Sequence, residues 1–119
     1  MSPDPAAAPA SGLTLQTRAW EDALIVHCSG RLTLEHSSAL KDHVRSLIPT
    51  TRGVILDLKD VTRMDSAGLG ALVAIYISAK KAKCEIALIN YNQSIKDLLG
   101  LTNLLTVFES CAQSGMRLP

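Results

Sequence analysis

The chain has 119 residues, enough for one compact domain, and its formal net charge of +1 excludes the basic excess on which nucleic-acid binding depends. Hydrophobic residues make up 47% of the chain but aromatic residues only 3%, so we expect a core of Leu, Ile, Val and Ala and no aromatic platform for bases. The longest strongly apolar stretch, residues 68–77, is too short to span a membrane.

Three scattered cysteines without a C-x-x-C pair argue against a disulfide framework and a zinc site. We therefore expect a cytoplasmic domain with no cofactor, no metal, no nucleic-acid partner and no membrane partner. Residues 1–11, with three prolines among alanines, are predicted to be a disordered N-terminal tail, and residues 12–119 to form the single domain. Alternating apolar residues predict a first strand over 13–20, and a two-residue turn leads to a second strand over 23–28, which Gly30 ends.

The apolar period changes in the next segment. From Glu35 to Ile48 the apolar residues recur at helical spacing, which predicts an amphipathic helix that stops at Pro49. The run from Val54 to Leu58 is typical of a central strand covered on both faces. The remaining predicted elements are a helix over 66–82, a strand over 85–89, a short helix over 94–99 ended by Gly100, and a short strand over 106–108 followed by a partial helix. This order predicts the α/β class, with a mixed four- to five-stranded sheet packed with helices.

The segment from Val54 to Tyr76 carries the functional signal. A buried strand runs into a polar loop, and Ser66 stands where the next helix opens, as a candidate N-cap beyond the carboxyl end of a central strand. Gly68 and Gly70 remove side-chain bulk from the first turn, so that another surface can approach closely. A phosphate on Ser66 would gain from the helix N-terminus and would add negative charge to a contact surface without unfolding the domain.

The helix behind Ser66 is apolar on nearly every side. Leu69, Leu72, Val73 and Tyr76 fall on one face, and the other faces are almost uncharged. A helix of this kind is either buried or docks onto another molecule.

Together the residues Asp65-Ser66-Ala67-Gly68-Leu69-Gly70 and the preceding strand Val54–Leu58 resemble the signature of STAS domains, in particular those of bacterial anti-sigma factor antagonists. The resemblance covers residues 13 to about 113. It implies a domain whose motif serine is phosphorylated by a kinase of the GHKL type that is also an anti-sigma factor. The unphosphorylated form captures this kinase and frees the sigma factor, the phosphorylated form does not, and a phosphatase would reverse the modification.

The resemblance also assigns roles by position. Ser66 would be the phosphorylated residue and Asp65 its flanking acid, and Asp57, Thr33 and Arg63 would be neighbours of the site. Thr33 stands where the family often has an aspartate, and Arg63 where an apolar or aromatic residue is common. The predicted partner-binding residues are Asp65, Ser66, Ala67, Gly68, Leu69, Gly70, Leu72, Val73 and Tyr76.

Other interpretations of Ser66 stay open at this point. It could be a structural N-cap only, in a non-catalytic scaffold or accessory subunit of a stress-sensing or lipid-transport complex. A catalytic serine is disfavoured because the Gly-x-Ser-x-Gly frame is missing and all three histidines, His27, His36 and His43, precede it. We therefore expect a binding protein and no enzyme.

Overall fold

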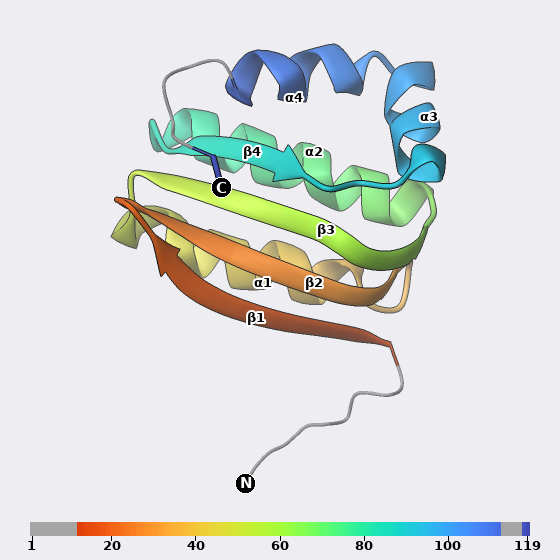
Figure 1. The fold of residues 1–119 in the computed structure, drawn as a ribbon, viewed down its shortest axis with the longest axis horizontal. Helices are drawn as coiled ribbons and strands as arrows, with labels where there is room; N and C mark the ends of the chain where they lie inside the picture. Colours follow the sequence, from red (N-terminus) through yellow and green to blue (C-terminus); the bar gives the residue numbers. More distant parts are fainter. Residues whose placement is uncertain (1–11, 113–117) are drawn as a thin grey trace, which may run out of the picture.

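A four-stranded mixed sheet organises residues 12–112 and 118–119, which the computed structural model describes (Figure 1). The strands, which lie side by side in chain order, are β1 (Leu13–Trp20), β2 (Ala23–Leu32), β3 (Gly53–Met64) and β4 (Glu85–Ile89). β1 and β2 form an antiparallel hairpin, whereas β3 and β4 are each parallel to the strand before them. The predicted fold class is confirmed. The predicted tail, residues 1–11, lies outside the described residues.

The helices are arranged on one face and one edge of this sheet. They are α1 (Ser37–Leu47), which continues into a short 3-10 helix (Ile48–Thr50), α2 (Ser66–Lys81), α3 (Gln93–Leu101) and α4 (Leu104–Ala112). Figure 1 shows α1 and α2 behind the sheet and α3 and α4 beyond β4, so that the front face carries no helix in the described part of the chain. Among these helices none has the length and apolar character needed to cross a membrane.

The main core lies between the sheet and the two helices behind it. Val54, Leu56 and Leu58 of β3 are fully buried and point to this side, as the alternation of a strand requires. α1 contributes Leu40 and Val44, spaced four residues apart on one face of the helix. Each such side chain stabilises the fold by roughly 1.5–3 kcal/mol when it is removed from water. A smaller cluster of Ala23, Ile25 and Ile55, with Trp20, Ile89 and Leu118 packed against it, covers part of the open face.

Two strands are longer than their sequences predict. β2 does not end at Cys28 but runs to Leu32, with Gly30 (φ 108°) accommodating an irregularity in its pairing with β3. Residues 59–64, predicted as a polar loop, are the second half of β3. The physical reason is that β4 pairs with β3 only as far as Asp57. Beyond that point no strand of the described chain pairs with β3 on this side, and its composition becomes that of a loop.

The C-terminal prediction is wrong in one element. The strand predicted over 106–108 belongs to helix α4, in which Phe108 is buried and its ring meets that of Tyr76 edge-on, with 5.8 Å between the ring centroids. The helix predicted over 94–99 extends one residue earlier and two later, and Gly100 lies inside it. Asn92 begins this helix because its side chain accepts a hydrogen bond from the Ile95 N–H at 2.9 Å.

Two glycines in the first turns of α2 have opposite environments. A Cβ atom built on Gly68 would lie 2.1 Å from the carbonyl oxygen of Leu32 in β2, a backbone atom that cannot move aside. A Cβ atom on Gly70 would meet nothing within 4 Å. Gly68 is therefore required for the packing of α2 on the sheet, whereas Gly70 leaves the fold less stable than alanine would.

We expect Gly68→Ala and Gly70→Ala to change stability in opposite directions. Gly68→Ala should lower the free energy of unfolding by about 1–3 kcal/mol, because the helix must shift away from β2. Gly70→Ala should raise it by about 0.5–1 kcal/mol, because alanine is the better helix former and has room. Urea unfolding followed by circular dichroism measures both. Equal effects of the two substitutions would contradict the close packing of α2 on β2.

Candidate functional site

Ser66 is the first residue of α2, but it is not the cap of this helix. The N-cap is Asp65, whose Oδ1 accepts a hydrogen bond from the Gly68 N–H at 3.0 Å. Ser66 is exposed, and within the described residues its hydroxyl group makes no hydrogen bond. The expectation that Ser66 caps the helix is therefore wrong. Its hydroxyl group is exposed and takes no part in the cap.

Asp65 also holds a second segment of the chain. Its Oδ2 accepts a hydrogen bond from the Leu34 N–H at 3.1 Å, so one carboxylate joins the start of α2 to the loop after β2. The hydrogen bond from Gly68, followed by those from Leu34 and Ala67, holds the pKa of Asp65 below its ordinary value of 3.8. The group is therefore a carboxylate at neutral pH. It places a negative charge next to Ser66.

The exposed face of α2 is narrower than the sequence predicts. Ser66, Gly70 and Ile77 are exposed and Val73 is half-buried, and these residues form one stripe along the helix at spacings of three and four. Leu72, a predicted partner-binding residue, is fully buried and packs in the core.

The other members of that set differ in burial. Gly68 is also buried, against β2. Ala67, Leu69 and Tyr76 are half-buried, and Tyr76 is partly covered by α4.

Two exposed apolar residues are not predicted as part of the site by the sequence pattern. Ile77 is 47% exposed at the far end of the stripe, and Leu34 is 75% exposed in the loop that Asp65 holds. The spacing of eleven residues from Ser66 is a signal that could have identified Ile77. Leu34 is far from Ser66 in the sequence, and only the folded chain brings its backbone next to Asp65.

The predicted neighbours Thr33 and Arg63 lie at the ends of β2 and β3. Thr33 is half-buried, and its carbonyl oxygen accepts hydrogen bonds from the N–H groups of His36 (2.9 Å) and Ser37 (2.8 Å), which shapes the loop before α1. Arg63 is exposed in the last part of β3, in register with Arg31 of β2. Both predicted residues are therefore in the segments that lead to the Ser66 region, and Thr33 directly precedes the residue bound by Asp65.

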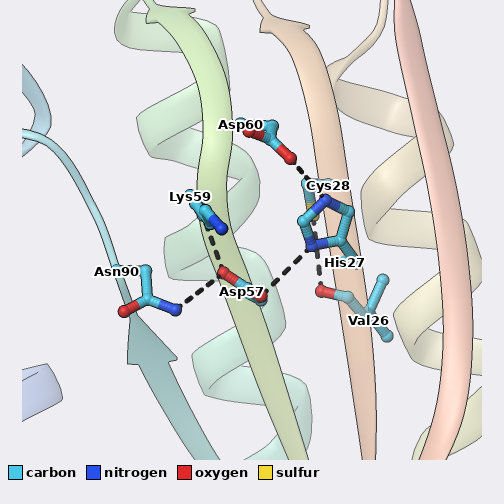
Figure 2. Close-up of polar contacts among 7 residues, drawn as sticks. All are labelled: Val26, His27, Cys28, Asp57, Lys59, Asp60 and Asn90. Atoms are coloured by element: carbon cyan, nitrogen blue, oxygen red, sulfur yellow. Dashed lines mark hydrogen bonds and ion pairs between the residues drawn. The ribbon is translucent and has the colours of Figure 1, made fainter.

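Asp57 is not part of this region. It lies about 20 Å before the end of β3, given the rise of a strand, and points to the open face of the sheet. Figure 2 shows it between His27 and Asn90, with the helices behind the strands. Its Oδ2 lies 3.1 Å from His27 Nδ1, and its Oδ1 accepts hydrogen bonds from Asn90 Nδ2 (3.2 Å) and the Lys59 N–H (3.1 Å).

The cluster around Asp57 is a separate polar group. His27 Nε2 lies 2.8 Å from Oδ2 of Asp60, so that each ring nitrogen faces a carboxylate. Burial by itself would raise the pKa of Asp57, but the hydrogen bonds from Lys59, Asn90 and His27 outweigh it and hold the pKa below 3.8. No group of three or more His, Cys, Asp or Glu residues in the described ranges is arranged to hold a metal ion.

Comparison with known proteins identifies the family. The STAS domain model matches residues 14–114, most of the chain. The protein belongs to the STAS domain family. The expected resemblance is thereby confirmed.

The most informative relatives of this STAS domain are bacterial regulators. The anti-sigma-B factor antagonist of Bacillus subtilis is 27% identical over 94 residues, which are 79% of this chain and 86% of the relative. The structure of an anti-sigma factor antagonist from Mycobacterium paratuberculosis matches with a TM-score of 0.74 at 20% identity, over 92% of this chain and 97% of that one. The phosphorylated form of the Bacillus cell fate determinant SpoIIAA matches with a TM-score of 0.63 at 14% identity, over 76% and 85%. The two structures show that the fold is shared.

We expect Asp57 to make the stability of the STAS domain depend on pH. Because its pKa is lower in the folded chain than its ordinary value of 3.8, its contribution is complete above that value and is lost as the pH falls below it. Asp57→Asn should be less stable than the wild type at a pH of about 6, and this difference should shrink at a pH of about 3. Urea unfolding at both pH values measures it, with the exposed Asp42→Asn of α1 as control. A difference that does not change with pH would refute this role of Asp57.

Proposed function

We propose that this STAS domain is an anti-sigma factor antagonist that regulates transcription by partner switching in the cytoplasm. It binds an anti-sigma factor of the GHKL serine-kinase type when Ser66 is unphosphorylated and releases it when Ser66 is phosphorylated. The observation that carries the proposal is the state of Ser66: its hydroxyl group is exposed at the first position of α2, while Asp65 caps the helix. The relationship to the antagonist of Bacillus subtilis supports the same role.

The modification is a phosphoryl transfer in which this protein is the substrate. The γ-phosphoryl group of ATP, bound by the partner kinase, moves to Oγ of Ser66. The bond from phosphorus to the oxygen of ADP breaks, the bond to Oγ forms, and the hydroxyl proton is released. A phosphatase would return the serine by hydrolysis, with water as the second reactant and inorganic phosphate as the product. The STAS domain itself supplies no catalytic group, so we propose that it is not an enzyme.

The exposed stripe of α2 is suited to a contact that a phosphate would interrupt. Gly70 lies between Ser66 and Ile77 without a side chain, and no atom of the described chain fills the space beside it. A partner can therefore approach the helix backbone at this point. A phosphate on Ser66 adds a charge of about −1.5 to −2 at the end of this stripe, and burying that charge against an apolar partner surface is unfavourable.

We expect the charge on Ser66 to control binding. Ser66→Ala should retain the anti-sigma factor kinase from a lysate of the native host, and Ser66→Asp should lose it, whereas Ser66→Asn should bind like Ser66→Ala because it has the shape of aspartate without its charge. Pull-downs with each variant and mass spectrometry of the retained proteins measure this. All variants should keep the circular dichroism spectrum of the wild type.

The alternative function makes a different prediction for the same experiment. In a permanent scaffold subunit the partner would be retained equally by Ser66→Ala, Ser66→Asn and Ser66→Asp. That result would refute partner switching through Ser66. It would also identify the partner of the scaffold.

Gly70 offers a second test of the binding surface. Gly70→Ala should make the protein more stable, and we expect it nevertheless to weaken binding of the same kinase by about tenfold, because the new methyl group holds the partner away from the helix. Gly100→Ala is the matched control, since Gly100 is also an exposed helical glycine with nothing within 4 Å of its Cβ position. Titration calorimetry measures both. Equal affinity of the two variants would show that the partner does not approach α2 at Gly70.

A further inference from the structure

The hydrogen bonds of Asp65 connect Ser66 with an exposed apolar residue. Oδ1 of Asp65 is bound to the Gly68 N–H at 3.0 Å and Oδ2 to the Leu34 N–H at 3.1 Å. Leu34 is 75% exposed in the loop that follows β2. The backbone of this loop is therefore held in part by a carboxylate that is next to Ser66 in the chain.

We propose that Leu34 is a second contact point for the anti-sigma factor kinase and that Asp65 makes its position depend on the charge on Ser66. The inference rests on the proposed phosphorylation of Ser66 and adds a contact residue and a route of regulation to it. In the unphosphorylated protein, the Asp65 carboxylate holds the Leu34 backbone against the start of α2. The exposed side chain of Leu34 is then presented near the start of α2 and enters an apolar pocket of the kinase.

Phosphorylation would weaken this arrangement in two ways. The phosphate competes for the N–H groups at the start of α2, and Asp65 already accepts the hydrogen bond of Gly68, one of these donors. The phosphate also repels the neighbouring carboxylate, whose bond to Leu34 lies at the surface and gives a small net stabilisation. Both effects displace the Asp65 carboxylate and therefore weaken the hydrogen bond that it accepts from the Leu34 N–H.

The link can be tested in the protein alone, by amide hydrogen exchange measured with NMR. We expect the Leu34 amide to exchange roughly three to ten times faster in Ser66→Asp than in Ser66→Asn, because the two side chains differ in charge but not in shape. The protein phosphorylated at Ser66 should show a larger effect. The Ile95 amide, which is bound by the cap residue Asn92 of α3, is the internal control and should not change. Equal exchange of the Leu34 amide in the two variants would overturn the link.

The proposed contact between Leu34 and the kinase is tested by measuring binding to the purified kinase that Ser66→Ala retains. Leu34→Ala should weaken its binding by about tenfold, as expected for an anchor residue. Leu101→Ala, which truncates a leucine that is 84% exposed on α3, should leave binding unchanged. Equal affinity of Leu34→Ala and the wild type would overturn the contact.

The outcomes separate this inference from the proposed function. If Ser66→Asp loses the kinase while the exchange of the Leu34 amide is unchanged, partner switching stands and the link through Asp65 is wrong. If all Ser66 variants bind the kinase equally, the proposed function fails, whatever the Leu34 amide does.

Discussion

The close approach of α2 to β2 is the constraint on which the site depends. Gly68 lies so near the carbonyl oxygen of Leu32 that no side chain fits between them. This contact positions the first turn of the helix at the end of β2, and it is the reason that Asp65 reaches the Leu34 N–H in the following loop. With the helix held in this way, Ser66 can only lie on the outer side. The exposure of the serine thus follows from the packing of a glycine two residues later.

Asp65 caps α2 while Ser66 is exposed beside it, and this arrangement determines how a phosphate on Ser66 would act. A serine that caps a helix would lose its structural role when it is modified. Here Asp65 caps, so a modified Ser66 leaves the hydrogen bond to Gly68 available. However, the Asp65 carboxylate already accepts the hydrogen bond of the Gly68 N–H, a donor that would otherwise attract the phosphate. The negative charge of Asp65 would therefore repel a phosphate at this helix terminus. In the proposed mechanism this repulsion weakens the hydrogen bond between Asp65 and the Leu34 N–H.

How far the sequence predicts the structure depends on whether the deciding interactions are local. The hairpin and α1 follow from apolar periodicity, and α2 and β4 from the apolar composition of their segments, all of which are local properties. The motif around Ser66 is sufficient to identify the family. The extension of β3 through residues 59–64 could not be predicted, because those residues form a strand only through pairing with β2. The sequence does not decide between Asp65 and Ser66 as the cap, because both residue types are equally good caps and only the backbone conformation distinguishes them. Leu34 joins the site through a hydrogen bond between segments 31 residues apart.

The separation between the core and the site explains why a charge on Ser66 need not unfold the domain. The buried leucines and valines of β3 face α1 and α2, and the polar cluster of His27, Asp57 and Asp60 lies on the other face of the sheet (Figure 2). Neither group contacts the exposed side of α2, where Ser66 begins a stripe that ends at Ile77. A change of charge at Ser66 therefore acts on surface contacts, each of small net stability, and leaves the buried apolar area unchanged. For the proposed cycle of capture and release, this arrangement would allow large changes in binding with little loss of folding stability.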